Sequence, residues 1–167
     1  CGMVYVDPKD LSYEPYWYMW SNSLKTEEST ELMNKLFEKY VPTLMEYIFE
    51  GIFNGEQGKR MKSVVPQNTL SMIIQLCYLL DSQINMAKYD LDQDGGEGQL
   101  KSAPPYLITQ ENLDLVESVF LHSLTWSLGA ALVEKDRLNF DAAIKQLAGM
   151  PAFNDETDKV FAKSGYL

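Results

Sequence analysis

Histidine and cysteine are scarce in this 167-residue sequence. It contains one histidine, His122, and two cysteines, Cys1 and Cys77. Structural zinc sites use four cysteine or histidine ligands, so a site of that class is disfavoured, as is a nucleophile paired with histidine. Two cysteines make no disulfide framework, which favours a reducing compartment such as the cytoplasm. Cys77 lies in an apolar run, where cysteine is usually a small buried hydrophobe.

Positive charge and long apolar runs are also lacking. The 14 basic residues face 24 acidic ones, which gives a formal net charge of −10 at pH 7. Nucleic-acid binding depends on lysine and arginine at phosphates, and anionic membrane surfaces attract the same residues. No apolar run approaches the roughly 20 residues of a membrane span. We therefore expect no nucleic-acid partner and no membrane partner, and we interpret the acidity as a solvated surface.

The sequence opens with "CGMVYVDPKDL", and residues 3–6 have the composition of a short strand that ends before Pro8. No second strand is predicted near it, and a lone strand is not stable. We therefore expect it to pair with strands outside this sequence. An aromatic-rich helix is predicted over residues 10–24, starting either at Asp10 or at Pro15 in its first turn. Its aromatic side chains are expected to serve packing, because no basic groove accompanies them.

Helical periodicity dominates the rest of the chain. Thr26 is expected to cap a second helix, with Glu27 and Glu28 favoured in its first turn by the helix dipole. Pro42 predicts a kink or a break into two helices. Two adjacent rows of apolar residues define the buried stripe of this helix: Leu32, Leu36, Tyr40, Leu44 and Ile48, and Met33, Phe37, Val41, Met45 and Phe49.

Three further helices are predicted. Asn68 caps the third, Thr109 caps the fourth, which Gly129 loosens or ends, and the fifth runs over residues 136–148 before Gly149. Residues 53–67 are expected to form a polar connection, residues 88–108 a long loop, and residues 151–167 a tail or strand. Hydrophobic residues make up 46% of the sequence, enough for a core. The predicted fold class is therefore mainly α: a bundle of about five helices with a short N-terminal strand. The expected buried positions of the last three helices are Leu70, Ile73, Ile74, Cys77, Leu80 and Ile84; Leu113, Val116, Phe120, Leu124 and Leu128; and Phe140, Ile144 and Leu147.

Two motifs resemble ligand-binding loops only in part. Residues 90–101, "DLDQDGGEGQLK", begin like a calcium loop, but Lys101 stands where the bidentate glutamate belongs. Residues 55–60, "GEQGKR", lack the first glycine and the final hydroxyl residue of a phosphate loop. An acidic flexible loop is the better interpretation of the first, and the second is rejected. We expect no metal site.

No catalytic pair is marked out by the sequence. His122 lacks a second ligand or nucleophile, so a structural role is favoured. The helix-borne carboxylates have the spacing of outward faces: Glu46, Glu50, Asp114 and Glu117. Arg137, near the start of the fifth helix, could reach an anion, although a solvated or salt-bridged arginine is the simpler interpretation. The residues alone thus indicate an acidic helical domain without a self-sufficient active site.

Three stretches together resemble segments of dynein heavy chains. "CGMVYVDPKDL" is similar to the end of the large α/β part of the second AAA+ module, and "ELMNKLFEKYVPTLMEYIFEG" resembles the kinked helix after it. "VFLHSLTWSLGAALVEKDRLNFDAAIKQL" resembles the stretch that closes the helical lid of that module. The order and spacing agree over nearly all of residues 1–150, and the axonemal branch is the more similar. The matching positions in the last stretch are Trp126, Ser127, Gly129, Arg137, Phe140 and Asp141.

The resemblance implies a part of a microtubule motor ATPase rather than a complete enzyme. Residues 1–9 would be the last strand of the α/β part, residues 10–150 the lid, and residues 151–167 the connector to the next module. The lid would pack over a nucleotide and relay its state to the neighbouring module, with no catalysis by this chain alone. Trp126, Gly129 and Arg137 are implied as the residues nearest the nucleotide.

The same resemblance implies ATP or ADP only in the intact motor, with no cofactor held by this chain alone. The implied partners are adjacent AAA+ modules of the same heavy chain and, through the full motor, the microtubule. The implied location is the cytoplasm and cytoskeleton, in the axoneme of a cilium or flagellum. Residues 90–105 would be an insertion.

Two alternatives stay open. The chain could be a free-standing acidic helical interaction module that docks through its aromatic first helix. It could also be a divergent calcium sensor that uses residues 90–101. A phosphate loop encoded upstream would favour the motor, a specific partner of the chain alone would favour the module, and calcium binding would favour the sensor.

Overall fold

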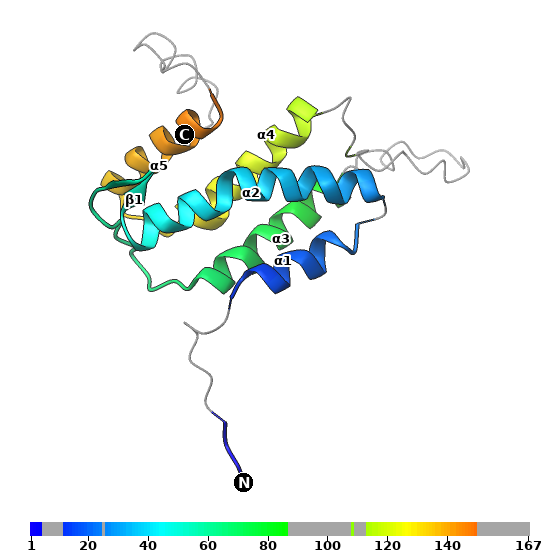
Figure 1. The fold of residues 1–167 in the computed structure, drawn as a ribbon, viewed down its shortest axis with the longest axis horizontal. Coiled ribbons are helices and arrows are strands. Elements are labelled where there is room, and N and C mark those ends of the chain that lie inside the picture. Colours follow the sequence, from blue (N-terminus) through cyan, green and yellow to red (C-terminus); the bar gives the residue numbers. More distant parts are fainter. Residues whose placement is uncertain (5–11, 25, 87–107, 109–112, 150–167) are drawn as a thin grey trace, which may run out of the picture.

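The computed structural model describes residues 1–4, 12–24, 26–86, 108 and 113–149 (Figure 1). Five α-helices, one short hairpin and one π turn make up this part of the chain, which confirms the mainly α fold class. The elements are α1 (Glu14–Ser21), α2 (Glu27–Phe49), β1 (Ile52–Phe53), β2 (Glu56–Gln57), α3 (Thr69–Met86), α4 (Leu113–Leu124), η3 (Thr125–Gly129) and α5 (Glu134–Leu147).

The predicted opening strand is not formed in the described residues. Met3 and Val4 lie outside any strand and are 93% and 88% exposed, while residues 5–11 lie outside the described part. A strand requires a hydrogen-bonded partner, and the one sheet found in the described residues is the β1–β2 hairpin. The strand therefore remains a prediction that depends on partners outside this sequence.

Helix α1 begins at the proline signal rather than at Asp10. Its first turn contains Glu14 and Pro15, and the helix ends at Ser21, three residues before the predicted end. The hydroxyl of Ser23 donates to the carbonyl of Trp20 at 2.6 Å and closes the last turn.

Helix α2 confirms both its cap and its buried stripe. The Thr26 hydroxyl accepts from the backbone N–H of Ser29 at 3.2 Å. Both predicted rows are buried except for the half-buried Phe49 at the end. Of the kink or break predicted at Pro42, the break is wrong, because the helix continues across the proline, and the kink stays a prediction. Pro42 and Glu38 are both exposed, so water can satisfy the carbonyl that the proline leaves without a partner.

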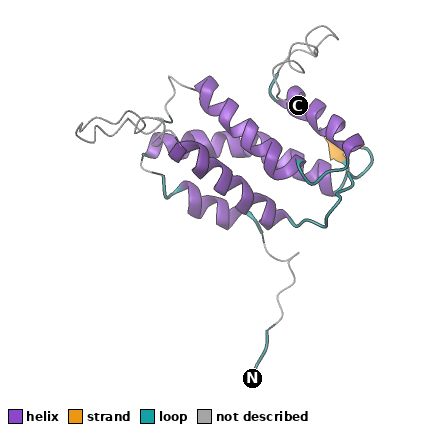
Figure 2. Cartoon of the chain, turned by 180° about the vertical axis from the view of Figure 1, so that it is seen from behind, coloured by secondary structure: helices purple, strands orange, loops and turns teal. Residues whose placement is uncertain are grey.

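A hairpin replaces the start of the predicted polar connection. β1 and β2 pair antiparallel, and Asn54 and Gly55 form the turn with φ angles of 51° and 81°. Positive φ at both positions is the geometry of a type I′ turn, which favours Asn-Gly. Figure 2 shows this hairpin at one end of the bundle, beside α5. It returns the chain so that residues 62–64 lie beside residues 131–133, which follow η3.

Aromatic side chains of α1 fill the centre of the bundle. Trp17 is fully buried and stacks on Phe37 at 4.3 Å between ring centroids, with Phe120 edge-on at 6.2 Å. Both α1 tryptophans satisfy their indole N–H groups: Trp17 donates to Asn34 at 2.9 Å and Trp20 to Asp81 at 3.0 Å. The predicted packing role is confirmed for Trp17 and Trp20 and for the half-buried Tyr13 and Tyr16, but it is wrong for Tyr18, which is exposed. No helix in the described part is long and apolar enough to cross a membrane.

The later helices keep most of their predicted buried positions, but Leu70 and Ile74 of α3 are only half-buried, and Met72 and Leu76 are buried in the core without having been predicted. Asn68 caps α3 by accepting from the N–H of Ser71 at 2.7 Å, and Gly149, with φ of 66°, follows the end of α5. Thr109 and the loop before α4 lie outside the described residues. The buried members of the predicted faces are Ile73, Cys77, Leu80, Val116, Phe120, Leu124, Leu128, Phe140 and Ile144.

Candidate functional site

The corner that joins α4 to α5 contains the three residues predicted to lie nearest a ligand. We define the corner as residues 125–137. It begins with η3, a single π turn that continues α4 without interruption. The prediction that Gly129 loosens or ends the fourth helix agrees with the structure, because the π turn that follows α4 ends at Gly129. The end of the α-helix at Leu124 and the π geometry after it were not predicted.

Spacing explains why the helix widens here. Val116, Phe120, Leu124, Leu128 and Leu132 are all buried at intervals of four residues. Four residues overshoot an α-helical turn by about 40°, so such a row drifts around the helix. A π turn is closed by i→i+5 bonds and holds more residues, so it opposes this drift. Leu128 consequently stays on the core face.

Gly129 is a packing position. A Cβ atom placed on it would lie 2.8 Å from Cε1 and 3.0 Å from Cδ1 of Phe140. Phe140 is 2% exposed, so its ring has little room to move. The glycine therefore lets η3 and α5 approach each other closely. This contact joins two of the motif positions identified in the sequence.

Arg137 holds the backbone of the corner. Its Nε donates to the carbonyl of Leu132 at 2.9 Å, and its Nη2 donates to the carbonyl of Ala130 at 2.8 Å. These carbonyls follow the end of the π turn, where helical partners run out. The solvated or salt-bridged arginine considered from the sequence is thus replaced by an arginine bound to backbone. Part of its donor capacity toward an anion is already used.

The corner is also tied to the segment after the hairpin. Val64 donates its N–H to the carbonyl of Ala131 at 2.8 Å, and Val133 donates to the carbonyl of Lys62 at 3.0 Å. The Asp136 carboxylate accepts from the N–H of Lys62 at 2.8 Å. Two neighbouring residues of α5 therefore hold the two sides of this antiparallel contact: Asp136 binds the backbone of Lys62, and Arg137 binds the backbone of the corner. The segment, the corner and the first turn of α5 form one hydrogen-bonded unit.

Of the three predicted site residues, Trp126 and Arg137 are exposed, and Trp126 is the one that presents a large aromatic side chain to solvent. It is 60% exposed, and its only described ring contact is His122, edge-on at 6.4 Å. It stands two residues after the buried Leu124, which places it on the opposite side of the helix. Leu138 on α5 is also exposed, at 73%. A large aromatic surface that is not used for packing is available to a partner or ligand.

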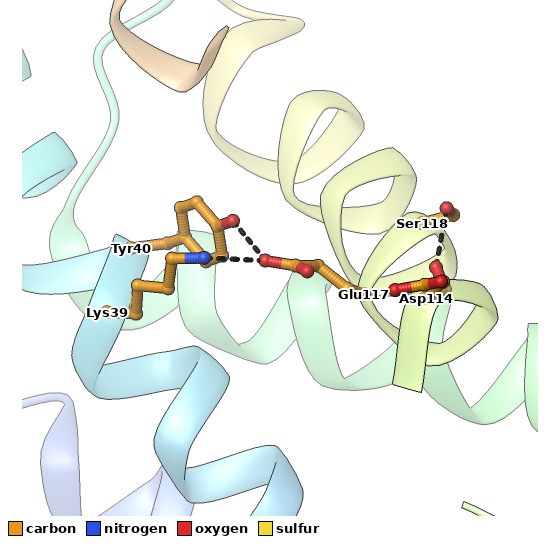
Figure 3. Close-up of polar contacts among 5 residues, drawn as sticks. All are labelled: Lys39, Tyr40, Asp114, Glu117 and Ser118. Atoms are coloured by element: carbon orange, nitrogen blue, oxygen red, sulfur yellow. Dashed lines mark hydrogen bonds and ion pairs between the residues drawn. The ribbon is translucent and has the colours of Figure 1, made fainter. Parts of the chain in front are cut away.

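A polar cluster of Lys39, Tyr40 and Glu117 fastens α2 to α4 (Figure 3). One carboxylate oxygen of Glu117 accepts from Lys39 Nζ at 2.8 Å and from the Tyr40 hydroxyl. Tyr40 is fully buried at its ring, so its hydroxyl needs this partner. The prediction that all four helix-borne carboxylates face outward is therefore wrong for Glu117. The position of Glu117 along its own helix does not reveal that α2 brings Lys39 and Tyr40 to it.

The cluster shifts the pKa values of its members. Burial alone would raise the pKa of Glu117, but the hydrogen bonds from Lys39 and Tyr40 outweigh it and leave the pKa below its usual value. The pKa of Tyr40 is raised by burial and by its bond to the carboxylate. Burial opposes a charged Lys39, yet its hydrogen bond to Glu117 leaves the net pKa raised. These directions describe an ion pair that holds the bundle together at neutral pH.

Further chemistry is sparse in the described residues. They contain no group of three or more histidine, cysteine, aspartate or glutamate side chains that could hold a metal ion. The calcium-like residues 90–101 lie outside the described part. Burial raises the pKa of Cys77 to about 12, so its thiol stays protonated and unreactive at neutral pH.

Comparison with known proteins gives this arrangement a context. A protein-family model described as the dynein heavy chain AAA lid domain matches residues 33–163. The chain is similar to human dynein axonemal heavy chain 10, with 42% identity over 167 residues. It is also similar to the Chlamydomonas reinhardtii dynein-1-alpha heavy chain of the flagellar inner arm I1 complex, with 36% identity over 160 residues. Human dynein axonemal heavy chain 6 is 31% identical over 170 residues.

These alignments cover 100%, 93% and 100% of this chain but 3% of each relative. The chain thus spans a small part of the curated relatives that it matches. No solved structure gave a significant match to the chain.

Proposed function

The chain belongs to the dynein heavy chain AAA lid family, and from that premise we propose that it is the helical lid of one AAA+ module. In this role it packs over the nucleotide of its own module and against the α/β part of the next. It passes nucleotide state between modules as a rigid-body movement. ATP or ADP would be bound in the intact motor, with the phosphates held by residues outside this sequence.

The activity of the motor as a whole belongs to the same proposal. The heavy chain would hydrolyse ATP and move on microtubules, while this segment contributes no catalytic residue. Its direct partners would be adjacent AAA+ modules of the same heavy chain. The names of the relatives, which are axonemal and flagellar, support a location in the cytoskeleton of a cilium or flagellum.

One observation carries this proposal: a large exposed aromatic side chain stands on a corner that is otherwise firmly held. Trp126 is 60% exposed, whereas Gly129 packs against Phe140 and Arg137 binds two carbonyls. These contacts hold Trp126 in a defined position in each arrangement of the corner, so little conformational entropy is lost when a partner binds. We assign Trp126 as the contact residue, with Gly129 and Arg137 positioning it beside the nucleotide-bearing neighbour.

Coupling requires that the lid contact its neighbour differently in different nucleotide states. The unit built from residues 62–64, the corner and α5 meets the mechanical requirement, since backbone hydrogen bonds join its parts. A force applied at Trp126 would therefore move α5 as well. The ion pair between Lys39 and Glu117 adds one polar contact between α2 and α4 to the apolar core that holds the bundle together.

The experiment compares heavy chains that carry Trp126→Ala, Trp126→Phe or no change. Aromatic anchors buried at interfaces commonly contribute about 2 kcal/mol or more, which corresponds to roughly thirtyfold or more in an equilibrium constant. We expect Trp126→Ala to lower steady-state ATP turnover by roughly tenfold to thirtyfold and Trp126→Phe to restore most of it. Circular dichroism of the 167-residue chain with each substitution checks folding. Unchanged turnover in a folded Trp126→Ala heavy chain would refute the assignment.

A further inference from the structure

The single π turn η3 is an uncommon element, and one buried hydroxyl group near it lacks a hydrogen-bond partner among the described residues. π turns inside helices are rare and occur frequently at functional sites. The hydroxyl of Ser123, two residues before η3, is fully buried and has no hydrogen-bond partner among the described residues. Nearby hydroxyls are satisfied: Thr125 donates to the carbonyl of Leu121 at 2.8 Å and Ser127 to that of Leu124 at 3.1 Å. A buried polar group without a partner marks a place where another local arrangement can compete.

We propose that η3 is a register switch: it interconverts between the π turn seen here and an α turn, and the change shifts the corner and α5 along the bundle. Two sets of contacts oppose each other at this turn. Burial of Leu128 and the close approach of Gly129 to Phe140 favour the π register. The unpartnered Ser123 hydroxyl and the ordinary preference of backbone for α geometry favour the other register.

The hydrogen bonds of the corner determine which residues move together. Ala131 and Val133 are bonded to the backbone of residues 62–64, and Asp136 accepts from Lys62. Phe140 packs on Gly129, so the start of α5 follows the end of η3. α5 also packs on α2, so the movement is a small slide of one helix along another rather than a detachment. Its use in relaying nucleotide state depends on the proposed function, whereas the switch belongs to this chain alone.

Backbone relaxation-dispersion NMR of the 167-residue chain, without nucleotide, tests the switch. We expect microsecond-to-millisecond exchange in residues 62–64, 125–133 and 134–140, fitted by one rate constant. Ser123→Ala removes the unpartnered hydroxyl, and we expect it to lower the population of the minor state about fivefold. The matched control is Ser118→Ala, because that exposed hydroxyl on the same helix already donates to the carbonyl of Asp114 at 2.7 Å. The control should leave the population unchanged.

Deletion of Thr125 removes one residue from the turn and provides a second variant. We expect its dispersion to vanish and its chemical shifts at the corner to move toward those of the minor state. Three results would overturn the switch. They are absence of exchange in the unmodified chain, separate rate constants for residues 62–64 and 125–133, and equal minor-state populations in the Ser123→Ala and unmodified chains. If exchange is found while Trp126→Ala leaves ATP turnover unchanged, the switch stands and the proposed function fails. If Trp126→Ala lowers ATP turnover while the unmodified chain shows no exchange, the proposed function stands and the switch fails.

Discussion

Replacing Gly129 by alanine brings two effects on the free energy of unfolding that act in opposite directions. Gly129 lies in η3 without a positive φ, so backbone conformation does not require glycine there. In an open helical position, alanine stabilises relative to glycine by about 0.5–1 kcal/mol. Here the new methyl group would lie 2.8 Å from the ring of Phe140, closer than side-chain carbons approach in proteins. The sign of the change therefore shows which effect is larger.

The contact should dominate. Overpacking in a filled core costs about 1–3 kcal/mol, and Phe140 is 2% exposed, so its ring cannot move aside into solvent. Subtracting the helical gain leaves an expected net loss of roughly 0–2.5 kcal/mol in the free energy of unfolding, centred near about 1 kcal/mol. For a chain of this length a loss of about 1 kcal/mol lowers Tm by roughly 2–4 °C.

Urea and thermal unfolding of the 167-residue chain, followed by circular dichroism, measure this change. A double-mutant cycle with Phe140→Leu identifies its source, because the smaller side chain frees space beside the new methyl group. We expect Gly129→Ala to cost about 1 kcal/mol less in the Phe140→Leu background. A stabilised Gly129→Ala chain, or additive effects in the cycle, would refute the packing argument for the corner.

Four further substitutions test other parts of the structure. Gly51→Ala should lower the free energy of unfolding by roughly 2–4 kcal/mol, because the φ of Gly51 is 79° and a Cβ there would lie 2.6 Å from a backbone nitrogen. Gly55→Ala is the matched control: its φ is 81° but the Cβ would meet open space, so it should cost about 1–2 kcal/mol. Equal losses for the two substitutions in urea titrations would contradict this. Tyr40→Phe should cost about 1–2 kcal/mol and raise the pKa of Glu117 in an NMR titration. Because the pKa of Glu117 is lowered in the folded state, its contribution to the free energy of unfolding is complete above the pKa of the unfolded state and is lost as pH falls through the pKa of the folded state. The Tyr40→Phe chain should therefore lose less stability on acidification than the unmodified chain. Identical pH dependence of the two chains would speak against the cluster. Ser123→Ala should be neutral or stabilising by up to about 1 kcal/mol, and a clear loss in thermal unfolding would mean that its hydroxyl has a partner.

Local sequence signals predicted the long helices well. The cap at Thr26, the cap at Asn68 and the rows of apolar residues in α2 all appear in the structure as expected. These features depend on interactions within a few residues, which a single sequence displays directly. The hairpin was missed although its signal, Asn54-Gly55, is present, because its strands of two residues are too short to show alternation.

The motif residues Trp126, Gly129 and Arg137 lie in one corner of the structure, and their place beside a nucleotide stays a prediction. Their contacts could not be predicted from the sequence. The bonds from Arg137 to two backbone carbonyls and the contact of Gly129 with Phe140 depend on how two helices meet, which no local pattern encodes. The π turn depends on the same packing. Its one sequence signal was the unbroken four-residue spacing from Val116 to Leu132, which exceeds the α-helical repeat.

Hydroxyl-radical footprinting of Trp126 tests the central claim most directly. The measurement compares the oxidation rate of this side chain in the 167-residue chain and in the heavy chain, with ATP and with ADP. Trp17, which is fully buried in the bundle, is the internal reference. The lid account predicts that Trp126 is protected in the heavy chain and that its protection differs between the two nucleotides, while Trp17 stays protected throughout. Equal oxidation of Trp126 in the isolated chain and in both nucleotide states of the heavy chain would contradict it.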